Sequence, residues 1–118
     1  MAYVDGFVLP VPRKNIEAYR RMAAEAGAVW REHGALEYRE WLADDVQPGK
    51  LTSFPQSVQL EESETVVFAY IVFESRRHRD EVNAKVMADP RIANMDQASV
   101  PFDGKRMIYG GFESLVEA

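Results

Sequence analysis

The 118-residue chain contains no cysteine, which excludes disulfides, thiolate nucleophiles and cysteine-ligated zinc or iron–sulfur sites. Positive charge is also scarce, because 14 Lys and Arg stand against 19 Asp and Glu, a net charge of −5. Binding to nucleic acid needs clustered cations, so we expect no nucleic-acid partner. The sequence has no apolar run long enough to span a bilayer and no signal-peptide pattern, and we therefore expect a cytoplasmic protein with no membrane association.

The composition is that of a globular domain. Hydrophobic residues make up 47% of the chain and charged residues 28%, far from the composition of disordered chains. A chain of 118 residues has the length of one domain. We therefore expect a single domain spanning residues 1–118.

Changes in hydrophobic period divide the chain into regular elements. Alternating β-branched and aromatic residues favour strands, whereas apolar residues at three- and four-residue steps favour helices. The expected elements are, in order, a strand at 3–11, a helix at 15–33, strands at 35–43 and 65–73, a helix beginning after Ser75 with a short continuation at 91–95, and a strand at 105–112. Residues 51–60 give no clear pattern, so their conformation is not assigned.

The order strand, helix, strand, strand, helix, strand predicts an α+β protein with the ferredoxin-like βαββαβ fold, in which two helices cover one face of a four-stranded antiparallel sheet. The strands at 3–11 and 65–73 are apolar on both alternations, which places them in the centre of the sheet. The face without helices would then leave a large apolar patch in water. We therefore expect a homodimer in which two sheets pack as a dimeric α/β barrel.

Three segments carry a family pattern. They are Tyr3-Val4-Asp5-Gly6-Phe7, Met87-Ala88-Asp89-Pro90-Arg91 and the longer run Phe102-Asp103-Gly104-Lys105-Arg106-Met107-Ile108-Tyr109-Gly110-Gly111-Phe112-Glu113. Together they resemble the YbaA-like family of small bacterial proteins of unknown function. The resemblance implies a ferredoxin-like fold assembled as a dimeric α/β barrel, in a superfamily that includes cofactor-free quinol monooxygenases, haem-degrading enzymes and muconolactone-isomerase-like proteins. It implies no established activity and supplies no catalytic residues.

Asp5 is a carboxylate within a strand that is otherwise apolar. If it faces the barrel interior, it is placed to accept a proton from a bound phenol or enol. The alternative is a structural ion pair with Arg106 or Lys105 on the neighbouring last strand, or hydrogen bonds to the backbone near Gly6. We favour the structural alternative.

Further polar and aromatic side chains on the expected strands are candidates for a site. Glu40 and Tyr70 join Asp5 as candidate polar groups for catalysis. Aromatic rings with hydroxyl groups suit a cavity for a planar ligand. The candidates for ligand binding are Tyr38, Trp41, Tyr109 and Arg106.

Histidine is too sparse and too scattered to suggest a metal centre. His33 fits the end of a helix, where a cation suits the dipole, and His78 falls in a charged helical turn. No pair of histidines has metal-ligand spacing, so we expect no metal and no cofactor. The arginines at 76, 77 and 79 are read as a solvated helix face with local ion pairs rather than as an anion-binding patch.

Two functions from different classes remain. The first is an uncharacterised cytoplasmic bacterial homodimer, either non-catalytic with a largely filled barrel interior or binding a small ligand there. The alternative is a cofactor-independent enzyme, resembling a monooxygenase or an isomerase, that acts on a small aromatic or enolisable substrate. A cavity of at least about 300 Å³ with convergent polar groups favours the enzyme, and a filled interior favours the non-catalytic protein.

Overall fold

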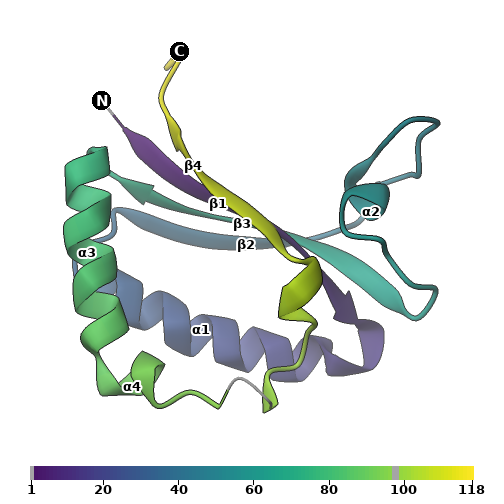
Figure 1. Cartoon of the computed structure of the whole chain (residues 1–118), viewed down its shortest axis with the longest axis horizontal. Helices are drawn as coiled ribbons and strands as arrows, with labels where there is room; N and C mark the ends of the chain where they lie inside the picture. Colours follow the sequence, from purple (N-terminus) through teal and green to yellow (C-terminus); the bar gives the residue numbers. More distant parts are fainter. Residues whose placement is uncertain (1, 97–98) are drawn as a thin grey trace.

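The computed structural model describes residues 2–96 and 99–118 (Figure 1). Its elements are, in chain order, β1 (Tyr3–Pro12), η1 (Arg13–Asn15), α1 (Ile16–Glu32), β2 (Glu37–Leu42), α2 (Phe54–Ser57), β3 (Glu64–Phe73), α3 (Arg76–Ala88), α4 (Pro90–Ala93), η3 (Gly104–Arg106) and β4 (Ile108–Glu113). The main helices and strands follow the order expected from the sequence, and the α+β class is confirmed.

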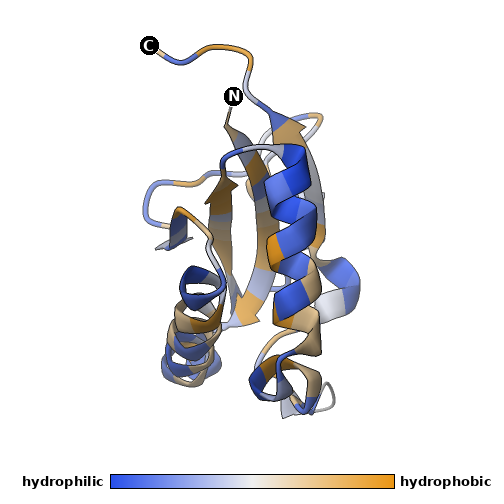
Figure 2. Ribbon diagram, turned by 90° about the vertical axis from the view of Figure 1, so that its left-hand side faces the viewer, coloured by the Kyte–Doolittle hydropathy of each residue, from blue (hydrophilic) through white to orange (hydrophobic). Residues whose placement is uncertain are grey.

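The four strands form one antiparallel sheet in the order β2-β3-β1-β4. The two strands that are apolar on both alternations, β1 and β3, are central, as the sequence predicted. Helices α1 and α3 lie on the same side of this sheet (Figure 1). In Figure 2 the strands are mainly hydrophobic, whereas the outward surfaces of the helices are mainly hydrophilic. The ferredoxin-like arrangement is therefore confirmed.

Short local signals define where the helices begin and end. Gly34 follows α1 with a φ of +118°, a backbone conformation that glycine adopts without strain. The Ser75 side chain accepts a hydrogen bond of 3.1 Å from the backbone N–H of His78 and so caps α3. In the same way the Asp89 carboxylate accepts a bond of 2.9 Å from the backbone N–H of Arg91 and caps α4.

Strands β2 and β4 are shorter than the sequence predicted. β2 lacks the outer residues of the expected range 35–43. β4 begins at Ile108 rather than at Lys105, because residues 104–106 form the single 3₁₀ turn η3. Asp103 stabilises that turn by accepting a bond of 2.9 Å from the backbone N–H of Lys105. The expected start of the strand at residue 105 is therefore wrong, because the Asp103 side chain caps a helical turn there.

Residues 51–60, which could not be assigned from the sequence, contain the one-turn helix α2. Ser53 caps it by accepting a backbone hydrogen bond of 3.2 Å. Just after α2, the side chain of Val58 is almost completely buried against Val8 and Val66. This segment therefore covers one end of the sheet face that the main helices leave free.

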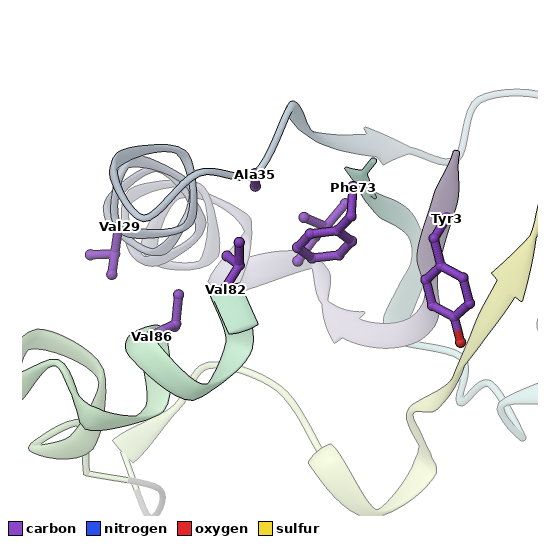
Figure 3. Packing of buried hydrophobic residues seen from close by; sticks show 7 residues of the cluster. Tyr3, Val29, Ala35, Phe73, Val82 and Val86 are labelled. Carbon is purple, nitrogen blue, oxygen red and sulfur yellow. The ribbon is translucent and has the colours of Figure 1, made fainter. Parts of the chain in front are cut away.

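The core lies between the sheet and helices α1 and α3. Successive strand residues point to opposite faces, so every second residue of β1 and β3 faces the helices. Figure 3 shows Phe73 and Tyr3 from the strands and Val82 and Val86 from α3 in one buried cluster. Phe73 and Val86 have no exposed surface.

The opposite side of the sheet, which we call the open face, is also apolar. Its apolar side chains are Val4, Val8, Trp41, Val66, Phe68, Tyr70, Val72, Ile108 and Phe112. Four of these, Trp41, Phe68, Ile108 and Phe112, are between 43% and 64% exposed. Charged groups lie at its margin, where Glu37 and Arg39 of the edge strand β2 pair with each other at 2.9 Å. The expectation that both faces of the sheet are apolar is thus confirmed.

Glu64, also at the margin of the open face, forms a bidentate ion pair with Arg106. The two terminal nitrogens of Arg106 donate to the two carboxylate oxygens of Glu64 at 2.8 and 2.6 Å. Glu64 is only 4% exposed, although it begins strand β3. The hydrogen bonds from Arg106 lower the pKa of Glu64 below its ordinary value of 4.5.

We expect Glu64→Gln to make the fold less stable at neutral pH and less sensitive to acid. Because the pKa of Glu64 is lower in the folded protein than in the unfolded chain, the ionised group stabilises the fold above pH 4.5, and this stabilisation is lost as the pH falls. Urea denaturation near pH 7 and at about pH 3.5 measures both effects. Glu62→Gln, which alters an exposed carboxylate two residues away, is the control. Equal acid sensitivity in Glu64→Gln and the wild type would contradict this account.

Candidate functional site

Three polar side chains converge on the helix-covered side of the sheet. Tyr38 and Glu40 are two residues apart on β2 and therefore point to the same face. The Tyr38 hydroxyl donates to Oε2 of Glu40 at 2.6 Å, and the hydroxyl of Tyr19 from helix α1 donates to Oε1. The Glu40 carboxylate thus links the edge strand to helix α1 through the Tyr19 hydroxyl, while its second oxygen accepts from Tyr38 of the same strand.

The electrostatics keep both tyrosines as hydrogen-bond donors. Burial, the negative charge of Glu40 and the hydrogen bond to its carboxylate together raise the pKa of the Tyr19 hydroxyl far above its usual value. The same causes, in the same order, raise the pKa of the Tyr38 hydroxyl. Both hydroxyls therefore stay protonated across the physiological range, and the negative charge of the cluster resides on Glu40.

A glycine allows the Tyr38 ring to reach this position. A Cβ atom on Gly27 of α1 would lie 2.6 Å from Cδ1 of Tyr38, which is closer than two carbon atoms can approach. The ring also packs against Trp30, with ring centroids 6.0 Å apart. Gly27 therefore sets the distance between α1 and β2 at the point where the three polar side chains meet.

We expect Gly27→Ala to destabilise the protein by up to about 2 kcal/mol. Overpacking against the Tyr38 ring costs about 1–3 kcal/mol, offset by about 1 kcal/mol from the better helix propensity of alanine. Urea denaturation measures the change in the free energy of unfolding. Gly104→Ala is the matched control, because among the described residues its added Cβ would meet only Phe102, at an ordinary 3.8 Å. A Gly27→Ala variant more stable than the wild type would show that the Tyr38 ring does not pack tightly against Gly27.

Two cavities meet at these polar side chains. The first, which we call the α1–β2 groove, has a volume of about 390 Å³ and runs between α1 and the edge strand. The second, which we call the sheet–helix cavity, has a volume of about 280 Å³ and lies beneath the sheet. Tyr19, Tyr38 and Glu40 line both cavities. They therefore form a polar partition between two largely apolar spaces.

Asp5 is held elsewhere, in a buried ion pair. Its carboxylate accepts from Arg79 of α3 at 2.7 Å and from the side-chain amide of Asn83 at 3.3 Å. The expected pairing with Arg106 or Lys105 is wrong, because Asp5 faces the helices and its partner comes from beneath the sheet instead of from the next strand. Its neutralised carboxylate lines neither cavity.

The other candidates from the sequence form no bond with Glu40 or Tyr38, although Tyr70 is among the residues that line the sheet–helix cavity. Tyr70 lies on the open face with its ring against Trp41, at a centroid distance of 6.4 Å. Tyr109 is 73% exposed and stacks on Phe7. Arg106 is occupied by the carboxylates that flank it at the sheet margin. Of these, Trp41 alone also borders the α1–β2 groove.

Tyr19 is a site residue that the sequence did not single out. Its place on the apolar stripe of the helix identified it only as core. A signal was nevertheless present, because a buried tyrosine hydroxyl needs an acceptor, and Glu40 is a carboxylate on a strand that faces the same helix.

Metal binding finds no support in the described parts of the chain. No group of three His, Asp or Glu residues there is placed to hold a metal ion. His33 contacts the Asp89 carboxylate at 2.8 Å, and the ring of His78 accepts from the backbone N–H of Glu74 at 3.0 Å. Both imidazoles thus have structural contacts at helix ends. None of the helices in residues 2–96 and 99–118 combines the length and the hydropathy needed to cross a bilayer.

The sheet order, the helix positions and the cavities beneath the sheet define a ferredoxin-like α+β protein. The structure of Rv0793 from Mycobacterium tuberculosis is similar, with a TM-score of 0.58 at 17% identity over 100% of this chain and 99% of that one. An uncharacterized NIPSNAP domain protein from Burkholderia xenovorans gives a TM-score of 0.57 at 10% identity, over 98% and 97% of the two chains. At these identities the likeness shows the fold alone.

The chain belongs to the family described as "Protein of unknown function (DUF1428)", whose pattern matches residues 2–104. It is 51% identical over 117 residues to the uncharacterized protein YbaA of Escherichia coli strain K12, covering 99% of each chain. The corresponding YbaA of Shigella flexneri matches to the same extent. The resemblance to the YbaA-like family seen in the sequence is therefore confirmed.

Proposed function

We propose that this protein is a homodimer that binds a small molecule on the helix-covered side of each sheet, beside Glu40. The observation that carries the proposal is the convergence of Glu40, Tyr19 and Tyr38 on the wall between two apolar cavities. Ligand sites typically combine apolar walls with a few fixed polar groups. The proposed site therefore lies on the opposite side of the sheet from the barrel interior that the sequence suggested.

The size of the two spaces supports a ligand of metabolite size. The volumes of about 390 and 280 Å³ fall near the lower end of the usual range for ligand pockets, about 300–1,000 Å³. The polar groups are also held in place, because each tyrosine hydroxyl is fixed by its bond to Glu40. A site with rigid polar groups discriminates between ligands by the hydrogen bonds that each can complete.

The dimer is supported by the chemistry of the open face. Four large apolar side chains remain exposed there, and the charged pair Glu37 and Arg39 is confined to its margin. A second copy is the occupant that we propose, because a two-fold axis covers the open faces of both copies in one step. Two sheets packed face to face lie about 10 Å apart and form a shared apolar interior.

Native mass spectrometry of protein purified gently from its own host tests both parts of the proposal. We expect a dimer that retains a non-covalent small molecule. In Glu40→Gln the carboxylate charge is lost, and we expect the affinity to fall by about tenfold or more, the effect of one charge-assisted hydrogen bond, so that a smaller fraction of the protein retains the ligand.

Glu37→Gln is the matched control for this experiment. It changes the same residue type on the same strand, but its side chain lies on the open face. Its occupancy should equal that of the wild type. Undiminished occupancy in Glu40→Gln contradicts the proposed site. The proposal is also contradicted if the purified protein carries no small molecule and no compound from a metabolite library raises its melting temperature.

A cofactor-independent enzyme is the second candidate. The α1–β2 groove exceeds the size that favours an enzyme, and Glu40 is a carboxylate that borders it together with two hydroxyl donors. In such an enzyme Glu40 would remove a proton from a bound enolisable compound, and a tyrosine hydroxyl would donate to the resulting enolate. Deuterium exchange into small ketones and lactones in D₂O tests this. Exchange that is catalysed by the wild type and abolished in Glu40→Gln distinguishes the enzyme from a binding protein.

A further inference from the structure

The sheet–helix cavity has an unusual wall. Apart from Tyr19, Tyr38, Tyr70 and Glu40, its lining residues are apolar or aromatic. Four of the five methionines of the chain line it, namely Met22, Met87, Met95 and Met107. They come from α1, from α3, from the segment after α4 and from the segment before β4. Methionine side chains are flexible and polarisable, and they make favourable contacts with aromatic rings.

Aromatic rings supply most of the remaining wall beside Glu40. Tyr19 and Phe102 meet edge to face with centroids 5.7 Å apart, and Trp30 packs against Tyr38. The polar atoms of these rings are already engaged. The indole N–H of Trp30 donates to Asn83 at 3.0 Å, and both tyrosine hydroxyls donate to Glu40. The rings therefore offer a ligand their π surfaces.

Negative charge in this cavity is not balanced by the protein. None of the described residues that line the cavity is Lys, Arg or His. Glu40 is half-buried and forms no ion pair with any described residue. Its carboxylate receives hydrogen bonds from two neutral hydroxyls, which leave its charge uncompensated.

The two arginines that border the α1–β2 groove, on the other side of the polar partition, already have partners outside the sheet–helix cavity. Arg20, which borders the α1–β2 groove, pairs with Glu17 at 3.3 Å. Arg31, at the other end of that groove, donates to the backbone carbonyls of Ala35 and Leu36. The positive charge that would complete the sheet–helix cavity must therefore come from its occupant.

We infer that the sheet–helix cavity takes a lipophilic organic cation, such as an aromatic amine or a quaternary ammonium compound, with its charge toward Glu40 and the surrounding rings. Cations are attracted to the faces of Trp, Tyr and Phe, and aromatic cages bind quaternary ammonium groups in this way. The apolar part of the ligand then packs among the methionines. This inference rests on the proposed function and specifies its ligand class. An anionic ligand would meet Glu40 with no compensating charge.

Three probes of matched shape test the charge preference: benzyltrimethylammonium, its neutral isostere neopentylbenzene and the anion phenylmethanesulfonate. The experiment uses Trp41→Phe, which leaves Trp30 in the cavity wall as the single tryptophan, since the chain has two. Trp41 is 47% exposed and does not line the sheet–helix cavity, and phenylalanine keeps an aromatic ring in its place. Binding is followed by the fluorescence of Trp30 and by calorimetry.

We expect benzyltrimethylammonium to bind about tenfold more tightly than neopentylbenzene and the anion not to bind measurably. The preference for the cation should disappear when Glu40→Gln is added to Trp41→Phe and persist with the control Glu37→Gln. If the neutral or anionic probe binds as tightly as the cation, this inference is overturned while the proposed function stands. If no probe binds at millimolar concentration, this inference is also overturned, and the small molecule retained from the host decides the proposed function independently.

Discussion

Asp5→Asn is expected to destabilise the protein by about 3 kcal/mol, the largest effect of any single polar substitution that we predict. The carboxylate of Asp5 is 7% exposed and pairs with Arg79, whose side chain is 19% exposed, at 2.7 Å. Although burial lowers the pKa of Arg79, the charges of Asp5 and Asp80 raise it overall, so the guanidinium remains charged in the variant. Removing one partner leaves this buried charge without full compensation, and the loss is near the lower end of the range for buried pairs because Asn keeps one hydrogen bond.

Thermal and urea denaturation of Asp5→Asn measure this change, and a shift in melting temperature on the order of 10 °C is expected. Asp80→Asn is the matched control. Asp80 also contacts Arg79, at 2.8 Å, but its side chain is 57% exposed, so its loss should cost less than about 1 kcal/mol. If the two variants are equally stable, the ion pair of Asp5 is not the buried interaction described here.

Phe112→Asp is expected to convert the proposed dimer to monomers. Phe112 lies on the open face of the edge strand β4 and is 64% exposed in the single chain, so a polar residue there does not disturb the monomer fold. In the dimer a two-fold axis would bury two unpaired carboxylates in an apolar interface. We expect the dimer dissociation constant to rise by at least about a thousandfold. Analytical ultracentrifugation over a range of concentrations measures it.

Another exposed aromatic residue of the same strand provides the control. Tyr109 is 73% exposed but points to the other side of the sheet, so Tyr109→Asp should leave the dimer intact. Equal dissociation of the two variants would argue against an interface on the open face. A wild-type protein that is monomeric at micromolar concentration would contradict the dimer itself.

The backbone arrangement could be predicted from the sequence because its signals are local. The double alternation of apolar residues in β1 and β3 identified them as the central strands, and His33 and Ser75 identified helix ends. The partner of Asp5 could not be predicted in the same way. Arg79 lies on α3, and only the packing of that helix beneath the sheet brings it to Asp5. The side chain of Arg77, two residues earlier, is 91% exposed, as expected for a solvated helix face. Within the arginine run, Arg79 is therefore the residue whose burial departs from that expectation.

The sequence could predict only those residues of the candidate site that lie on one strand. Tyr38 and Glu40 stand out because alternate residues of a strand share a face. Tyr19 did not stand out, because an aromatic residue on an apolar helix stripe is usually core. The methionines of the sheet–helix cavity come from four separate segments, and no spacing along the chain brings them together. Cavities depend on how elements pack, so this part of the site requires the tertiary structure.

The sheet order also determines when the first strand finds its neighbours during synthesis. Both partners of β1 follow it late in the chain, because it pairs with β3, up to Phe73, and with β4, up to Glu113. At typical rates of translation the ribosome needs about 3–12 s to add the roughly 60 residues that separate the end of β1 from the end of β3. Throughout that time a strand that is apolar on both faces has no neighbour. The nascent chain is therefore most vulnerable to aggregation before β3 emerges, and substitutions that slow the pairing of β1 with β3 should lower the yield of folded protein more than their effect on equilibrium stability would indicate.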